Sequence, residues 1–424
     1  MVLKINSYNI NNAEFTDGAS KIEGDTIFIN QEALKQDLSH ESLVKVELDI
    51  VKPGDSVRII KVLDMVQPIA SPDKKIFPGF LNEPSTVGWG STNRIEGFRI
   101  ISCGTFPQIQ TTSLTTKDGI IDMSGPGAEI CMGSDTVNFV VTYYPKDNVS
   151  NEEFDNITRK LTLTLAEYFG KMTLDLEPDK VDNYDLSIEN PELPNVVYAN
   201  QLQDQGPHIR PYLYGRPLGE NFVPTWISPL EMMDGAIVSG NYRNCMKKPT
   251  SFHLSDPIVA ELMQQHNKSL NFKGVIVYRG HHGDSSLKLR SSSCVAKLAK
   301  MIGADGVVVA MEGTGNGTID FQFTIESCEK ANIKTVGIIH ELGGTIGDDA
   351  PLVYRSPYTD ALVSTGGVER EFPIGPVEKV IGGNHYLNYM MLERDPQKGF
   401  IARPMDFYGS FWKMNASGIT CQEI

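Results

Sequence analysis

Apolar and polar residues alternate in the first part of the chain, and this pattern predicts β-strands. Residues 44–50 (VKVELDI) place the two kinds in turn, as in a strand with one buried face. Residues 57–63 indicate a second strand, and residues 52–55 (KPGD) have turn composition, so the pair is predicted to form a hairpin. Glycine and proline interrupt the sequence repeatedly up to residue 127. We therefore expect residues 1–140 to be rich in strands.

A long amphipathic helix is predicted after this region. Ser150 and Glu153 have the spacing of a capping box, and Gly170 is a plausible end. The apolar residues between them fall on one helical face: Phe154, Ile157, Leu161 and Leu165. Residues 174–194 are acidic and contain three prolines, which favours an irregular connection before a strand-like segment at 196–198.

Beyond residue 245, short apolar segments alternate with amphipathic ones. The predicted strands are 274–278, 306–311, 335–339 and 361–364. Three helices are predicted: one that begins at Asp256-Pro257, one that includes residues 295–302, and one near residues 321–331. Apolar strands separated by helices are typical of a parallel sheet covered on both faces. The predicted fold class is α/β, with a β-rich mixed N-terminal half followed by a C-terminal parallel-sheet, Rossmann-like half.

Composition narrows the class of protein. The chain has 424 residues, 40% hydrophobic and 21% charged, as in a globular enzyme of about two or three domains. A formal charge of −15 argues against nonspecific nucleic-acid binding. We see no signal peptide and no apolar run long enough to cross a bilayer, so we expect a cytoplasmic protein. The six cysteines form no CxxC pair, which excludes a zinc knuckle or dithiol motif and favours reduced thiols.

Candidate acid/base residues follow the predicted strands. Ligands gather at the carboxyl ends of parallel strands, where this sequence places Glu312, His340 and Glu341 beside glycine-rich turns. These turns are equally well explained as tight connections, because the loop at 313–317 fits neither dinucleotide nor phosphate-loop motifs. His281 and His282 are adjacent, so they do not converge on one metal ion, and surface histidines are the preferred interpretation.

The Asn244–Cys245 bond is a candidate for self-cleavage. It lies between the two predicted regions, in a stretch flanked by Gly240 and Pro249 that allows a strained turn. A cysteine thiolate can attack the preceding carbonyl when that peptide bond is held out of its relaxed geometry. The thioester can then eliminate to dehydroalanine, which tautomerises and hydrolyses to a pyruvoyl ketone and ammonia. From the dipeptide alone, an ordinary loop with a buried thiol is the preferred interpretation. An intein splice point is excluded, since no upstream junction is present.

Four stretches change this preference. The chain resembles the component B α/β proproteins of the glycine, sarcosine and betaine reductases, and the similarity runs in order along nearly its whole length. The stretches that carry it are 86–92 (TVGWGST), 119–128 (GIIDMSGPGA), 233–241 (MDGAIVSGN) and 302–307 (IGADGV), with 363–366 (VSTG) and 378–382 (EKVIG) in the tail.

The resemblance implies a role for Cys245. In that family the cysteine a few residues after Ser-Gly-Asn becomes a pyruvoyl group, which here makes Asn244 the donor of the attacked carbonyl. Residues 1–244 and 245–424 would then be two associated chains. The ketone takes a substrate amine as a Schiff base, and a selenocysteine of a separate carrier displaces the amine. The implied partners are a small amine or amino-acid substrate, the selenoprotein subunit of component B, selenoprotein carrier A and component C.

The residues beside Cys245 depart from the glycine-specific pattern. In those members the cysteine follows small residues and precedes an acidic one, whereas here Arg243-Asn244 precede it and Met246-Lys247-Lys248 follow. Arg243, Lys247 or Lys248 could hold a substrate carboxylate, although solvated surface charges are the preferred interpretation. The substrate therefore stays open among glycine, sarcosine and betaine. The alternative function is that of an unprocessed paralogue, a small-molecule-binding or scaffold subunit.

Overall fold

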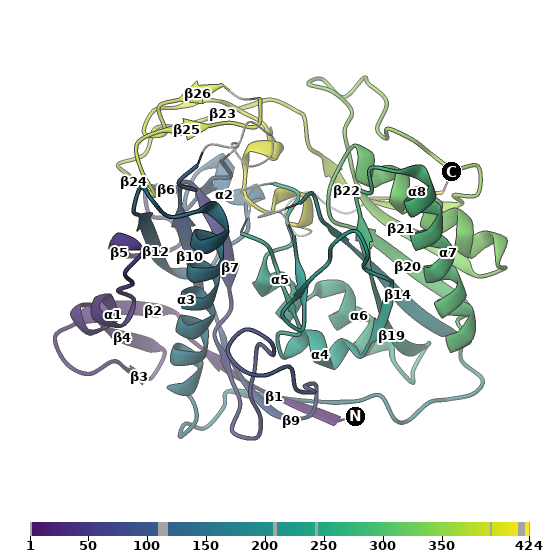
Figure 1. Cartoon of the computed structure of the whole chain (residues 1–424), viewed down its shortest axis with the longest axis horizontal. Coiled ribbons are helices and arrows are strands. Elements are labelled where there is room, and N and C mark those ends of the chain that lie inside the picture. The colour runs from purple at the N-terminus through teal and green to yellow at the C-terminus, as the bar shows by residue number, and fades with distance from the viewer. Residues whose placement is uncertain are drawn as a thin grey trace.

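The computed structural model describes residues 2–108, 118–206, 210–241, 245–390, 392–413 and 420–423. It has a mixed α/β fold with several sheets, as the sequence predicts at this level. In Figure 1 the N-terminal sheets lie at the left and a large α/β layer lies at the right. Helices α4, α5 and α6 lie between these two parts.

Two four-stranded sheets form most of the N-terminal part. Both mix parallel and antiparallel pairs. The first has the order β13 (Lys180–Asp185), β1 (Val2–Asn9), β9 (Gly90–Glu96) and β8 (Ile69–Ala70). The second has the order β5 (Leu43–Val51), β12 (Val137–Pro145), β10 (Phe98–Gly104) and β7 (Val62–Val66).

Small sheets surround these two. Three of them have three strands: β11 (Ile121–Asp122), β6 (Val57–Ile59) and β24 (Lys379–Ile381); β16 (Arg216–Pro217), β15 (Tyr212–Leu213) and β18 (Ile237–Val238); and β2 (Asn12–Thr16), β4 (Thr26–Asn30) and β3 (Lys21–Glu23). Two are strand pairs: β23 (Phe372–Ile374) with β27 (Phe400–Ala402), and β25 (Tyr386–Leu387) with β26 (Glu393–Arg394).

The large sheet of the α/β part has seven strands. Its order is β17 (Thr225–Ile227), β19 (Asn271–Gly280), β14 (Asn195–Gln203), β20 (Gly306–Met311), β21 (Lys334–Glu341), β22 (Ala361–Gly367) and β28 (Thr420–Glu423). The five strands from β19 to β22 are parallel to one another, and the two edge strands are antiparallel to their neighbours. Their carboxyl ends therefore meet at one edge of the sheet.

The helices differ widely in length. The long ones are α3 (Asn151–Lys171), α7 (Ser285–Ile302) and α8 (Asn316–Lys330), and the shorter ones are α1 (Gln31–Asp37), α2 (Pro126–Ile130), α4 (Pro229–Met233), α5 (Thr250–Leu254) and α6 (Pro257–Gln265). Two 3₁₀ turns, η1 (Pro404–Asp406) and η2 (Ser410–Trp412), follow near the C-terminus.

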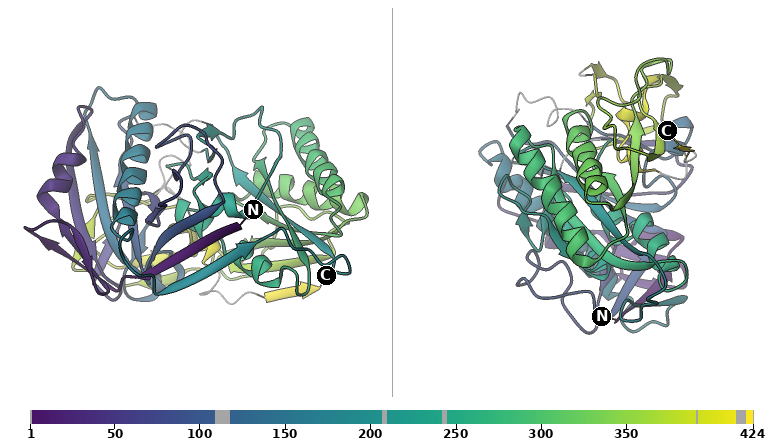
Figure 2. Two further views of the ribbon diagram at one scale, coloured as in Figure 1. Left: turned by 90° about the horizontal axis from the view of Figure 1, so that it is seen from below. Right: turned by 90° about the vertical axis from the view of Figure 1, so that its right-hand side faces the viewer.

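The two faces of the large sheet have different covers. Alternate residues of β14, such as Val197 and Ala199, belong to the core under α7 and α8. These two helices lie side by side on the outer face, toward the viewer in the right-hand view of Figure 2. Tyr198 and Leu202 belong instead to a core shared with the N-terminal part. The inner face is thus also buried against the rest of the chain, and it carries apolar side chains together with the buried polar Asn200.

Two local predictions are wrong. Strands β5 and β6 do not form a hairpin, because β5 pairs with β12 and β6 pairs with β11 and β24. The stretch 174–194 is not wholly irregular, since β13 within it pairs with β1. In both cases the partner is distant in sequence, and local composition carries no information about it. Among the helices of the described ranges, none combines the length and apolar composition needed to cross a bilayer.

The large sheet extends across the position at which we expect the chain to be divided. Strands β14 and β17 precede residue 245, and β14 lies between β19 and β20, which follow it. In the other direction, β24 pairs with β6 of the N-terminal part. Residues 1–244 and 245–424 therefore interleave in space and do not form two separate folding units.

Candidate functional site

Cys245 lies between the inner face of the large sheet, the N-terminal part and the 3₁₀ turn η2. Its side chain is 1% exposed and belongs to the core that joins the inner face of the large sheet to the N-terminal part. The backbone oxygen of Cys245 accepts a hydrogen bond from the Phe411 amide of η2 at 3.3 Å. The preceding residues Tyr242, Arg243 and Asn244 lie outside the described residues.

Glu312 fixes the chain just after Cys245. It follows β20 at the carboxyl edge of the sheet and is buried. One carboxylate oxygen accepts a hydrogen bond from the backbone amide of Lys248 at 3.0 Å, and the other accepts one from the backbone amide of Gln203 at 2.9 Å. Glu312 therefore ties the segment that carries Cys245 to the end of β14.

Lys248 is buried in an aromatic cage on the inner face of the sheet. Its ammonium group donates hydrogen bonds to the Tyr198 hydroxyl at 3.1 Å and to Asn200 Oδ1 at 2.7 Å. The Trp412 ring centroid lies 4.0 Å from Nζ, within the range of a cation–π contact. Burial lowers the pKa of Lys248 to about 8, although the Asp256 and Glu312 carboxylates act in the opposite direction.

Lys247 is also fully buried, and it faces the N-terminal part. It forms an ion pair with Asp64 of β7 at 3.2 Å. Burial lowers the pKa of Lys247, and the Asp64 carboxylate counters this effect. The interpretation of Lys247 and Lys248 as solvated surface charges is wrong, because their partners come from distant segments that close over them.

His340 reaches the same region through Phe411. The two rings pack with centroids 4.1 Å apart, and His340 Nε2 lies 3.0 Å from Thr314 Oγ1. Burial lowers the pKa of His340 to about 3, so the ring is neutral at physiological pH. Glu341 is half-buried, and its carboxylate has no hydrogen-bond or ion-pair partner within the described ranges. The structure thus brings Glu312 and His340 to the surroundings of Cys245 and leaves Glu341 apart from that network.

Two further side chains lie beside this group. Burial raises the pKa of the Tyr389 hydroxyl, and the electrostatic effects of Cys245 and Glu369 act in the same direction. His253 of α5 is buried, and neither ring nitrogen has a hydrogen-bond partner in the part of the chain that the structure describes. Burial together with Lys248 and Lys247 lowers the pKa of His253 well below its usual value.

The adjacent histidines have different environments. His282 is fully buried, and its Nδ1 lies 2.6 Å from Asp320 Oδ1. His281 is only partly exposed, so the interpretation of both as surface histidines is wrong. Burial lowers the pKa of His281 to about 4. Within the described residues, no group of three or more His, Cys, Asp or Glu side chains is positioned to hold a metal ion.

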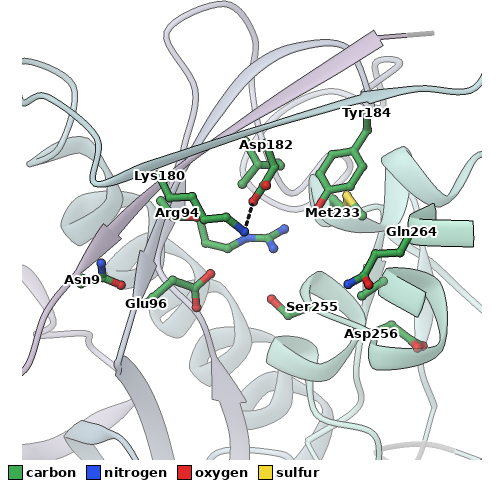
Figure 3. A pocket seen from close by; sticks show the side chains of 13 residues that line it. Asn9, Arg94, Glu96, Lys180, Asp182, Tyr184, Met233, Ser255, Asp256 and Gln264 are labelled. Atoms are coloured by element: carbon green, nitrogen blue, oxygen red, sulfur yellow. Dashed lines mark ion pairs between the residues drawn. The ribbon is translucent and has the colours of Figure 1, made fainter. Parts of the chain in front are cut away.

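A separate pocket opens between the β1–β9–β13 sheet and α6. Its volume is about 410 Å³, and Arg94, Lys180 and Asp182 point into it (Figure 3). Lys180 and Asp182 form an ion pair at 2.8 Å. Among the predicted site residues that the structure describes, none lines this pocket. Asp256 lines it and hydrogen-bonds Tyr198 at 3.4 Å, which places Asp256 between the pocket and Lys248.

Comparison with known proteins identifies the family. Residues 1–394 match the family model of the glycine/sarcosine/betaine reductase component B subunits. The chain belongs to this family. The resemblance inferred from the sequence is therefore confirmed, and with it the reductase class. The matched region includes Cys245, Glu312, His340 and Glu341, whereas Phe411 and Trp412 follow it.

Individual relatives of this family support the same conclusion. The component B subunits alpha and beta of the Acetoanaerobium sticklandii glycine reductase complex are 34% identical, covering 90% of this chain and 89% of theirs. The sarcosine reductase component B subunit alpha of Peptoclostridium acidaminophilum is 33% identical over 92% of this chain and 91% of its own. The D-proline reductase proprotein PrdA of A. sticklandii is 25% identical over 75% of this chain and 52% of its own. No solved structure matches the chain.

The sequence alone did not predict most of the residues that surround Cys245 in this member of the component B family. Tyr198 and Asn200 lie on one face of β14, and their period-two spacing is the one local signal that could have paired them. Asp64 and Trp412 lie far from Cys245 in the sequence and carry no such signal. The buried position of the two lysines was equally hidden, since their partners are non-local.

Proposed function

We propose that this reductase component B subunit is a precursor that cuts itself between Asn244 and Cys245, and that residue 245 becomes a pyruvoyl group. The observation that supports the proposal is a buried cysteine in a chain of this family: Cys245 comes four residues after Ser239-Gly240-Asn241, and Glu312 holds the backbone amide of the nearby Lys248. The relative named as a proprotein is consistent with such processing.

The proposed maturation uses only atoms of the chain and water. The Cys245 sulfur bonds to the Asn244 carbonyl carbon while the peptide C–N bond breaks, and the released amine takes the thiol proton. Loss of the α-proton of residue 245 then breaks its Cβ–S bond. The sulfur stays on Asn244 as a thioacid, and dehydroalanine is left at residue 245. After tautomerisation to an imine, water replaces the nitrogen and releases ammonia, so no oxidant is required.

The surrounding residues fit a small polar group at this position. His253 and the Asn200 side-chain nitrogen have hydrogen-bonding capacity that no described residue satisfies. The pyruvoyl ketone would supply an electrophilic carbonyl that makes a primary or secondary amine, as in glycine or sarcosine, a better leaving group, whereas the quaternary nitrogen of betaine cannot bond to it. Lys248 holds a positive charge beside the site at neutral pH, since its pKa of about 8 lies above that range. That charge suits the carboxylate of a small amino acid.

The proposed substrate class is glycine, sarcosine or betaine, on which the family's named members act. The carboxymethyl group would pass to selenoprotein carrier A and then to component C, and the selenoprotein subunit of component B would complete the complex. All of these partners would be cytoplasmic. His340 and Glu312 are assigned to the walls of the site, and Glu341 to its rim.

The test is a denaturing gel of the purified wild-type chain beside Cys245→Ala. We expect two fragments, residues 1–244 and 245–424, from the wild type and one uncut chain from the variant. Cys328→Ala is the matched control, since it removes another buried cysteine and should still be cut. The smaller fragment should resist Edman degradation, because its first residue has no free amine. Mass spectrometry should show that hydrazine or borohydride modifies it, as expected of a ketone. A single intact wild-type band with an unmodified thiol would support the alternative of an uncleaved binding or scaffold subunit.

A further inference from the structure

The segment around Cys245 is pinned at its base by one buried side chain. Lys247 Nζ donates a hydrogen bond to the Leu63 backbone oxygen of β7 at 2.6 Å and another to the Gly240 backbone oxygen. The bond to Gly240 links the described stretch that ends at Asn241 to the one that begins at Cys245. The Asp64 carboxylate, 3.2 Å from Nζ, balances the charge of the ammonium group.

A second set of hydrogen bonds holds Ser239 and Thr250, which lie on either side of the Gly240–Lys247 stretch. Thr250 donates its hydroxyl to Asp64 Oδ2 at 2.6 Å and its amide to Asp64 Oδ1 at 3.1 Å. The same hydroxyl accepts a hydrogen bond from the Ser239 amide at 3.0 Å. Asp64 therefore joins residues 239, 247 and 250 at one point of β7, and both limbs of the segment leave from that point.

Asn241 and Cys245 are held as well. The Asn241 side-chain nitrogen donates to the Asp155 backbone oxygen at 3.1 Å and to Thr158 Oγ1 at 3.0 Å, both in α3. At the other side, Cys245 is held by the Phe411 amide. Asn241 and Cys245 are thus anchored to two different elements, α3 and η2, and Lys247 links their two stretches of chain through its bond to Gly240.

We infer that Lys247 is a positioning residue for the self-cleavage of the Asn244–Cys245 bond. Intramolecular attack is fast only when the nucleophile and the carbonyl are held in the reacting geometry. A lysine is suited to this role because its ammonium group can donate three hydrogen bonds. Here it donates two to backbone oxygens and forms an ion pair with a carboxylate. Burial excludes the water that would compete for these acceptors. The inference rests on the proposed function, since it assigns the residue that sets up that reaction.

The test measures the rate of self-cleavage. Chains are pulse-labelled during expression, and the loss of the full-length band is followed over time on denaturing gels. We expect Lys247→Met to be cut roughly 100-fold more slowly than the wild type, the size of effect that misplaced reacting groups produce. That variant leaves Asp64 buried without its cation, so it also loses stability. The double variant Lys247→Met/Asp64→Asn removes the unpaired charge, and we expect it to recover thermal stability while remaining slow to cleave.

Arg58→Met is the matched control for a lost buried ion pair. Arg58 is fully buried against Asp122 at 2.6 Å, and its other partners lie in residues 375–398. We expect this variant to lose stability and still to cleave at the wild-type rate. Cleavage of the double variant at the wild-type rate would overturn the role of Lys247 while leaving the proposed function intact. An uncut wild-type chain would overturn both.

Discussion

At the scale of single residues, the two adjacent lysines after Cys245 have opposite surroundings. Lys247 meets a carboxylate and backbone oxygens, which hold its charge in a fixed place. Lys248 meets the Tyr198 hydroxyl, the Asn200 side-chain oxygen and the rings of Tyr198, Phe252 and Trp412, and no described carboxylate forms an ion pair with it. The pKa of Lys248 near 8 follows from this difference. One lysine therefore suits a structural role, and the other a role in which a ligand completes its charge balance.

Buried neutral histidines should make the protein less stable as the pH falls below about 6.5. The pKa of His340 is lowered to about 3, whereas an unfolded histidine takes up its proton near 6.5. The stability from its neutral form is therefore complete above pH 6.5 and is lost as the pH falls toward 3. His281, with a pKa of about 4, and His253 act in the same direction. Each contributes at most about 1.4 kcal/mol per pH unit within its window.

Thermal unfolding of His340→Gln between pH 4 and pH 8 tests this expectation. Below pH 6.5 the melting temperature of the variant should fall less than that of the wild type, because glutamine does not take up a proton on unfolding. His40→Gln is the control, since the His40 side chain is exposed. If His340→Gln and the wild type decline in parallel, His340 is not buried in its neutral form.

At the scale of elements, Gly170 shows how a helix is fitted to a strand. The sequence suggested a helix end there, but α3 continues to Lys171. A Cβ at Gly170 would lie 2.3 Å from the Ile69 carbonyl carbon of β8, so the glycine is required by close approach of two backbones. Backbone atoms cannot rotate aside as a side chain can. The contact therefore fixes the distance between α3 and the N-terminal sheet.

Gly170→Ala should therefore destabilise the protein even though alanine favours helices. We expect a loss of about 1–3 kcal/mol or more, as is typical of overpacked cores, measured as a lower denaturation midpoint. Gly317→Ala in α8 is the matched control, because the nearest atom to its Cβ would be 3.5 Å away. That variant should be neutral or slightly stabilising. Equal midpoints for the two variants would contradict the close packing of α3 on β8.

The same scale shows what sequence could predict and what it could not. The segments that form β19, α7, β20, α8, β21 and β22 were found because each carries its own periodicity. The partner of β5 was not found, since pairing with β12 depends on residues far along the chain. The site follows the same rule. Glu312 and His340 were located by their place after or near a strand end, whereas Asp64 is 183 residues from Lys247 and has no local signal.

At the scale of the whole molecule, the large sheet and the inner core both mix residues from before and after Cys245. Strand β14 has hydrogen-bonded neighbours on both sides that follow the expected cleavage point. The core around Cys245 includes Ile59 and Met65 from the N-terminal part and Val275 and Phe407 from the later part. Cutting one peptide bond leaves these contacts in place. Cleavage should therefore produce two fragments that remain one folded unit.

Separate production of the two fragments tests this interleaving directly. Residues 245–424 alone lack β14, so β19 and β20 each lose a partner and expose an unpaired edge together with the apolar inner face. We expect this fragment to aggregate when expressed alone and to stay in solution when residues 1–244 are expressed beside it, the two then eluting together in native size-exclusion chromatography. The uncut Cys245→Ala chain gives the reference elution volume. A monomeric 245–424 fragment that melts cooperatively by itself would contradict the role of β14 as an interior strand, because without it β19 and β20 have no common neighbour to join them.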